Sequence, residues 1–117
     1  MHPPLEHIRL SATAREELIR LKRHVRIEQW NVFCRWAFCL SMADPSRVSA
    51  QRNPADSNVE MTWKVFAGQY EDAYLALLLH RCHVDGIAPT GPNLGQQLRA
   101  HIHRGIFSPR LKELLAR

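Results

Sequence analysis

The stretch WNVFCRWAFCLSM, residues 30–42, has almost no polar face and restricts the fold more than any other part of the chain. Only Asn31, Arg35 and Ser41 are clearly polar within it. A helix that is apolar nearly all round is buried, either at the centre of a core or in a subunit interface. The chain is therefore expected to fold around this helix, with its other elements covering it.

Two cysteines in this stretch, Cys34 and Cys39, lie about 140° apart around an α-helix. They cannot join each other or share one metal ion on a regular helix. Free cysteine packs as a small, buried hydrophobe, so both are predicted to be core residues and not a redox or metal site. Arg35, between them, needs a carboxylate, a carbonyl or a phosphate partner. The carboxylates to consider first are Asp44, Glu60 and Asp85.

The N-terminal part of the chain reads as a strand followed by a helix. HIRLS, residues 7–11, alternates apolar and polar side chains, which predicts a short strand with one apolar face. Thr13 and Glu16 have the form of a capping box that opens a helix. The apolar residues at helical spacing are Ala14, Leu18, Leu21 and Val25.

Loop, strand and helix patterns then follow one another. Residues 43–58 are rich in Pro, Ser, Asn and Asp and are predicted to form a loop. Residues 59–65 alternate as a strand would, although their aromatic spacing also suits a helix. Helices are predicted over residues 70–83, 93–106 and 108–117. The first of these is expected to carry Ala73, Leu77 and Leu78 inward.

These elements predict a mainly α fold: one compact helical domain over residues 1–117, opened by a short strand, with one further short strand. The longest apolar run, AYLALLL, is far shorter than a membrane span requires. The first residues show no secretory signal, and three cysteines without a C-x-x-C pair suit reduced thiols. We expect a cytoplasmic protein with no membrane association.

No catalytic or metal site stands out in the sequence. HRCHVD and HIHRG hold four histidines and one cysteine, but their spacing matches no zinc pattern. The carboxylates are scattered, and no phosphate-binding glycine loop is present. No catalytic residue, metal or cofactor is therefore predicted. Cys82 is the candidate reactive thiol, because an arginine and two histidines flank it and could lower its pKa.

The charge pattern favours an anionic partner. The net charge is +5, and only three of the 16 basic residues are lysines. Arginine pairs bidentately with phosphate and carboxylate, so nucleic acid or an acidic protein surface would suit this chain. The plainer alternative is a solubilising surface with salt bridges. The candidate DNA-binding residues are Arg9, Arg15, Arg20, Lys22, Arg23 and Arg26.

Four blocks, WNVFCRWAFCLSMADPS, SNVEMTWKVFAG, LLLHRCHVDG and HIHRGI, in this order and spacing resemble the DndE family. DndE is the small subunit of the bacterial DNA phosphorothioation (DNA sulfur modification) system, and the resemblance runs from about Ile8 to Ile106. It implies a mostly helical fold opened by a ribbon-helix-helix-like unit, self-association, and binding of double-stranded DNA, including nicked duplex, through basic surface residues. Lysines are associated with DNA binding in the family, so arginines must take their place in this lysine-poor chain.

The resemblance also implies partners that supply the chemistry. These are a cysteine desulfurase that mobilises sulfur, an iron–sulfur sulfurtransferase-like subunit that relays it, and an ATPase-like subunit that handles DNA. The protein itself would then be a homo-oligomer, and its first strand could pair with the same strand of a second copy, because a lone strand leaves backbone groups unpaired. Trp30, Trp36 and Phe38 are expected to pack in the core or in a subunit contact.

Three functions from different classes follow. The first is a non-catalytic DNA-binding subunit of the sulfur-modification machinery. The second is an enzyme that acts on DNA, with nicking activity or with sulfur transfer through Cys82. The third is an adaptor that docks the cysteine desulfurase through its arginines. We favour the first, because phosphate contact without base reading suits a modification subunit.

Overall fold

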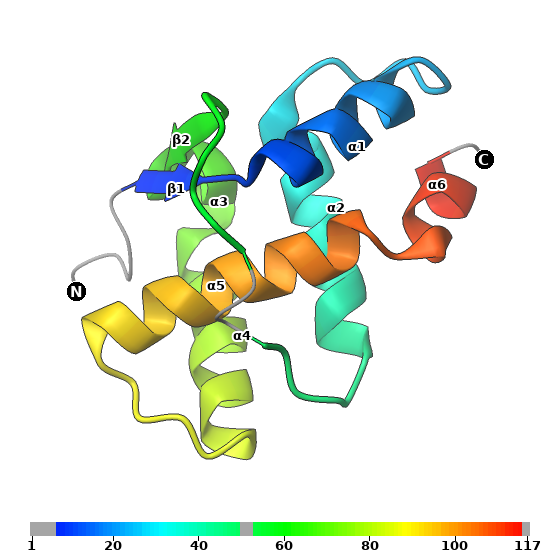
Figure 1. The fold of residues 1–117 in the computed structure, drawn as a ribbon. Helices are drawn as coiled ribbons and strands as arrows, with labels where there is room; N and C mark the ends of the chain where they lie inside the picture. The colour runs from blue at the N-terminus through cyan, green and yellow to red at the C-terminus, as the bar shows by residue number, and fades with distance from the viewer. Residues whose placement is uncertain (1–6, 50–52, 116–117) are drawn as a thin grey trace.

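The computed structural model describes residues 7–49 and 53–115. Along the chain the elements are β1 (His7–Arg9), α1 (Ala12–Lys22), α2 (Trp30–Ala43), β2 (Glu60–Thr62), α3 (Trp63–Ala67), the 3₁₀ turn η2 (Gly68–Tyr70), α4 (Glu71–Val84), α5 (Gly91–Ile106) and α6 (Pro109–Leu115). The predicted mainly helical fold with short strands is confirmed (Figure 1). None of the helices in the described residues is long and apolar enough to cross a membrane.

The two strands form a small antiparallel sheet within one chain. Ile8 pairs with Met61, and both side chains are buried. The premise that β1 is a lone strand needing a second copy is therefore wrong, since β2 supplies its hydrogen-bonding partner. The second strand is shorter than predicted, because the Thr62 side chain accepts a hydrogen bond from the Val65 amide and so begins α3.

Helix α1 begins earlier than its sequence pattern indicates. The N-cap is Ser11, whose Oγ accepts from the Ala14 amide at 3.1 Å, so the predicted capping box at Thr13 is wrong. Thr13 lies two residues beyond the cap, inside the first turn, because the chain turns into the helix directly after β1. The predicted apolar residues Ala14, Leu18 and Leu21 are buried.

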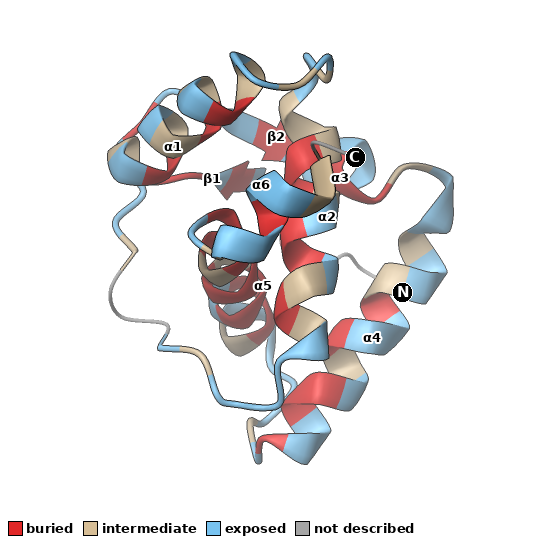
Figure 2. Cartoon of the chain, turned by 90° about the vertical axis from the view of Figure 1, so that its right-hand side faces the viewer, coloured by how far each residue is buried: buried red, intermediate tan, exposed pale blue. Residues whose placement is uncertain are grey.

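Helix α2 lies at the centre of the molecule, as predicted, and α5 packs across it (Figure 1). The two backbones come so close that a Cβ built at Gly105 would lie 1.8 Å from the Ala37 carbonyl oxygen. Most of α5 is buried, as Figure 2 shows by colour. Cys34 and Phe38 are fully buried as predicted, but Cys39 is exposed and lines a surface pocket with Tyr74, so its prediction as a core residue is wrong.

Arg35 finds partners other than the expected carboxylates. Its guanidinium donates to the backbone carbonyls of Val65 and Phe66, which tie α3 to α2. A carbonyl oxygen at the end of a short helix has no intrahelical donor, so it can accept these hydrogen bonds.

Helix α4 turns a different face to the core from the one predicted. Leu78 is buried as expected, together with Leu75, but Ala73 and Leu77 are exposed. Apolar side chains occur on both sides of this helix, so periodicity alone did not identify the buried side.

Candidate nucleic-acid interface

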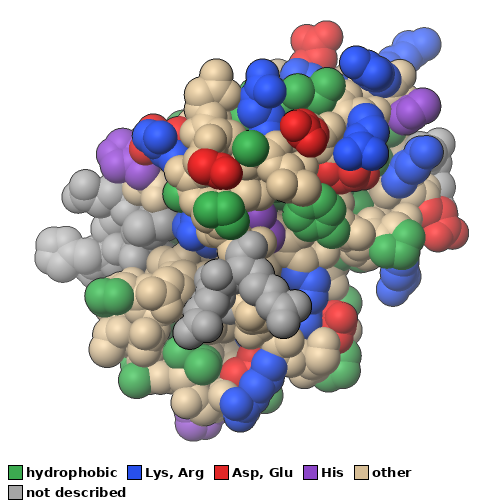
Figure 3. Space-filling view, viewed as in Figure 1, with side chains coloured by type: hydrophobic (Ala, Val, Ile, Leu, Met, Phe, Trp, Pro, Cys, Tyr) green, Lys and Arg blue, Asp and Glu red, His purple; other side chains and the backbone are tan. Residues whose placement is uncertain are grey.

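Helix α1 and the turn after it carry five of the six predicted DNA-binding residues: Arg15, Arg20 and Lys22 lie in the helix, Arg23 is its C-cap and Arg26 follows it. Arg20, Arg23 and Arg26 are exposed, and Arg15 and Lys22 are half-buried. Figure 3 shows Lys and Arg side chains gathered over this end of the molecule, with acidic side chains among them. One side of the helix buries apolar residues, so its charged side chains are held outward.

Few partners neutralise these cations. Arg20 lies 3.5 Å from Glu17 in an exposed ion pair, which contributes little stability in water. The Lys22 ammonium lies 4.5 Å from the centre of the Trp30 ring, a cation–π contact that leaves its charge intact. Within residues 7–49 and 53–115, the guanidinium groups of Arg15, Arg23 and Arg26 have no hydrogen bond or ion pair. They are free to contact an anion.

Arg9 differs from the residues of α1. Its Nη2 donates to Glu60 Oε2 at 2.9 Å across the two-stranded sheet, and His7 Nδ1 lies 3.5 Å from the other oxygen of that carboxylate. Much of the positive charge at Arg9 is therefore offset locally. An anion would have to compete with Glu60 for it.

A buried polar network that the sequence analysis missed holds the start of α1. The Ser11 amide donates to His103 Nε2 at 3.0 Å, and His103 Nδ1 lies 2.7 Å from the Arg99 carbonyl oxygen. His103 is therefore neutral, with its proton on Nδ1, and burial lowers its pKa. The Ala12 amide donates to Asp56 Oδ1 at 2.7 Å. These contacts fix the direction in which α1 presents its arginines.

Two further arginines hold the end of α2. Arg104 Nε donates to Ser41 Oγ, and its other donors reach the carbonyl oxygens of Ser41, Asp44 and Ser46. Arg81 pairs with Asp85 at 2.9 Å and donates to carbonyls of the same turn. The carbonyl end of a helix attracts cations, so these two side chains cap α2 and the start of the following loop.

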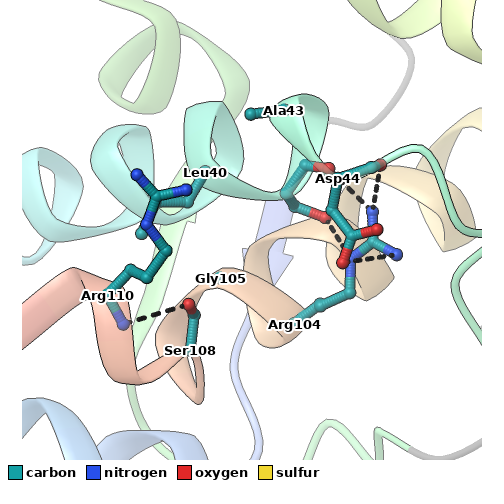
Figure 4. Close-up of a pocket in the computed structure, with 8 residues that line it drawn as sticks. Leu40, Ala43, Asp44, Arg104, Gly105, Ser108 and Arg110 are labelled. Carbon is teal, nitrogen blue, oxygen red and sulfur yellow. Dashed lines mark hydrogen bonds and ion pairs between the residues drawn. The ribbon is translucent and has the colours of Figure 1, made fainter.

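A pocket of about 260 Å³ lies beside this cap (Figure 4). Arg104 and Asp44 line one side of it, and Arg110 and Ser108 the other. All the donors of Arg104 are used in capping, and the Asp44 carboxylate, whose pKa is lowered by hydrogen bonds from Ser46, repels anions. The Arg104 guanidinium is therefore committed to the helix cap and is not available to a ligand in the pocket.

His101 lies next to the same cap, fully buried. Its Nδ1 is 2.7 Å from Ser41 Oγ, and its Nε2 has no partner among the described residues. Burial, with Arg81 and Arg104 nearby, lowers its pKa to about 4. The ring is therefore neutral at physiological pH.

The candidate thiol does not have the properties that were predicted for it. Cys82 is buried, and burial together with the Asp85 charge raises its pKa, so the expectation of a lowered pKa is wrong. The neighbouring Arg81 cannot activate it, because Arg81 is committed to Asp85 and to backbone carbonyls. Burial also raises the pKa values of Cys34 and Cys39. In the described part of the chain, no group of three or more His, Cys, Asp or Glu side chains could hold a metal ion.

The family model for the DNA sulphur modification protein DndE matches residues 7–113. This chain belongs to the DndE family. DndE from Escherichia coli B7A, involved in DNA phosphorothioation modification, has a similar fold, with a TM-score of 0.68 at 22% identity over 86% of this chain and 93% of that one.

A DndE mutant involved in DNA phosphorothioation is also similar, with a TM-score of 0.65 at 19% identity over 86% of this chain and 94% of that one. No curated protein matches the sequence. The DndE family is involved in DNA phosphorothioation, so the predicted membership of a DNA sulfur modification system is confirmed.

Proposed function

We propose that this chain is a non-catalytic DNA-contacting subunit of the DNA sulfur modification machinery, and that the exposed face of α1 contacts the phosphates of duplex DNA, nicked duplex included. The observation that carries this proposal is a set of three arginines, Arg15 on that face and Arg23 and Arg26 in the turn after the helix, whose side chains have no partner within the described residues. An arginine side chain without a partner in the protein can contact a phosphate and release counterions. No hydrogen bond or ion pair within the protein has to break for this contact.

The geometry favours contacts to phosphate over reading of bases. The arginines extend from a short helix and the turn after it, and β1, which could otherwise enter a groove, has Arg9 engaged with Glu60. Contacts of this kind set position and affinity and carry no sequence information. The subunit would then hold DNA while other subunits of the system carry out the sulfur chemistry: a cysteine desulfurase, an iron–sulfur sulfurtransferase-like subunit and an ATPase-like subunit.

An enzymatic role has less support. None of the three cysteines has the lowered pKa that a sulfur-transfer nucleophile needs, and the described residues hold no carboxylate cluster for a catalytic metal ion. The binding experiments described below distinguish an adaptor role from DNA binding.

The test measures DNA affinity against salt for the parent protein and for an Arg20→Ala/Arg23→Ala variant. If both side chains contact phosphate, the slope of log K against log salt falls by about 1.8, since each lost phosphate contact changes it by about 0.9. The matched control is Arg47→Ala/Arg110→Ala, which removes the same net charge from exposed positions outside α1. Equal slopes for the two variants would contradict the assignment of α1 as the DNA-facing surface.

The same binding reactions, run on intact and nicked duplexes with and without Mg²⁺, separate the three functions. DNA whose migration in a gel-shift assay is retarded, but which is not cut, supports the proposal. Metal-dependent nicks would replace it with an enzyme. No shift at low salt would favour the adaptor.

A further inference from the structure

One side of helix α2 is left uncovered by the rest of the described fold. Ala37 and Ser41 lie against α5, through the Ala37 backbone and the Ser41 side chain. Cys39 is two residues from each of them, about 160° away around the helix, and is exposed. Trp36, expected in the core or in a subunit contact, is 44% exposed and is not a core residue. A helix with almost no polar face is stable only when it is buried, so this side has apolar surface that another molecule can cover.

A pocket of about 290 Å³ opens on this uncovered side. It is lined by Val32, Arg35, Trp36 and Cys39 of α2 and by Tyr74 of α4. The four residues of α2 follow one another at intervals of three, one and three, so they share one face of the helix. Figure 2 shows α2 between α5 on one side and α4 on the other. The aliphatic and aromatic walls would shield an apolar group from water.

Arg35 supplies the charged group of the pocket. Its Nε and Nη2 donate to the carbonyl oxygens of Phe66 and Val65, whereas its Nη1 makes no hydrogen bond with any described residue. Across residues 7–49 and 53–115, no carboxylate pairs with this guanidinium. The fixed position of Arg35 and its uncompensated positive charge favour an acidic group in the occupant.

The surface around the pocket indicates a protein as the occupant. Tyr70 is 58% exposed and Leu77 is 45% exposed, and they lie about one turn before and one turn after Tyr74. Trp, Tyr and Arg are the residue types that most often dominate the binding energy of protein interfaces. A free small molecule would fill the pocket and leave Tyr70 and Leu77 in water, whereas a partner protein would cover them as well.

We propose that this pocket binds a segment of a partner protein that presents one large apolar side chain with a carboxylate next to it. The apolar side chain enters between Val32, Trp36 and Tyr74, and the carboxylate lies against the Arg35 guanidinium. The pocket volume of about 290 Å³ is just below the range of about 300–1,000 Å³ that is typical of small-molecule sites, and it suits a single anchoring side chain.

This site is separate from the proposed DNA-contacting surface and does not depend on it. Helices α1 and α4 lie toward opposite ends of the molecule in both ribbon views (Figures 1 and 2). The largely apolar lining also does not suit a phosphate backbone. The chain can therefore hold DNA through α1 and a partner protein through the pocket at the same time.

A set of model peptides tests the chemistry of the occupant. The probe is acetyl-Gly-Phe-Glu-Gly-amide, and NMR follows the indole N–H resonance of Trp36 during the titration. This resonance should shift and saturate. Glutamine in place of the glutamate should weaken binding about fivefold, because the charge-assisted hydrogen bond to Arg35 is lost, and serine in place of the phenylalanine should abolish saturation. Equal behaviour of the three peptides, no shift with any of them, or equally tight binding of free phenylacetate would overturn the proposal.

Two variants at one position test the place of binding. Cys39→Phe fills the pocket and should weaken binding of the probe peptide at least 10-fold, whereas the matched control Cys39→Ala leaves the pocket open and should stay within about twofold of the parent. Cys39 is exposed, so both variants should fold, and near-ultraviolet circular dichroism checks this. Equal affinity of the two variants would place the peptide elsewhere and overturn the proposal.

Alkylation of Cys39 in the parent protein provides a test without any substitution. The probe peptide should slow the reaction of this thiol with iodoacetamide, because the thiol lines the pocket that the peptide fills. An unchanged rate at saturating peptide would contradict the proposal. A rate that falls with protein concentration alone would assign the pocket to a contact between copies of this chain, which would also overturn it.

Discussion

Replacing Gly105 by alanine should destabilise the fold strongly, because α5 touches the backbone of α2 at this point. The added Cβ would lie 1.8 Å from the Ala37 carbonyl oxygen, and no rotamer change can relieve the overlap. Carbon and oxygen atoms that are not bonded need about 3.3 Å, so the two helices would have to separate by roughly 1.5 Å. Overpacking of this kind costs about 3 kcal/mol or more, against a gain of about 1 kcal/mol in helix propensity.

The net loss of about 2 kcal/mol should appear in urea unfolding as a lower midpoint at an unchanged slope, and as a fall of about 8 °C in Tm. Gly91→Ala is the matched control: it lies at the start of the same helix, where nothing lies within 4 Å of the added Cβ, and it should change stability by less than about 0.5 kcal/mol. A Gly105→Ala variant as stable as the parent would refute the close approach of α2 and α5.

Three further outcomes are expected. Cys34→Ser should lower the free energy of unfolding by about 1–3 kcal/mol, because it buries a hydroxyl. Cys39→Ser, at an exposed position, should change it by less than about 0.5 kcal/mol. Chemical denaturation measures the free energy of unfolding of both variants. Arg81→Ala should cost about 3–5 kcal/mol by the same assay, since it leaves Asp85 buried without its partner. The lowered pKa of His101 means that the unfolded chain binds its proton more readily, so stability should fall as the pH drops from 6.5 toward 4, by up to about 1.4 kcal/mol per pH unit; His101→Gln should flatten this part of the profile.

The sequence was sufficient to place α2 at the centre of the molecule. A helix with almost no polar face is stable only when it is buried, and the burial of Phe33, Cys34 and Phe38 follows from this. The helical regions were also predictable, because apolar residues recur at helical spacing along most of the chain.

Other features depended on contacts that are distant in sequence. Ser11 and Thr13 are both good capping residues, and the choice of Ser11 depends on where β1 ends and on His103, far along the chain. The particular carbonyls that Arg35 contacts could not be inferred either, because every residue carries a backbone carbonyl and the sequence does not distinguish among them.

The two-sided pattern of α4 also explains why its core face was misassigned. Leu75 and Leu78 mark one apolar side of the helix, and Ala73 and Leu77 mark another. Only the packing of α4 against its neighbours decides between them.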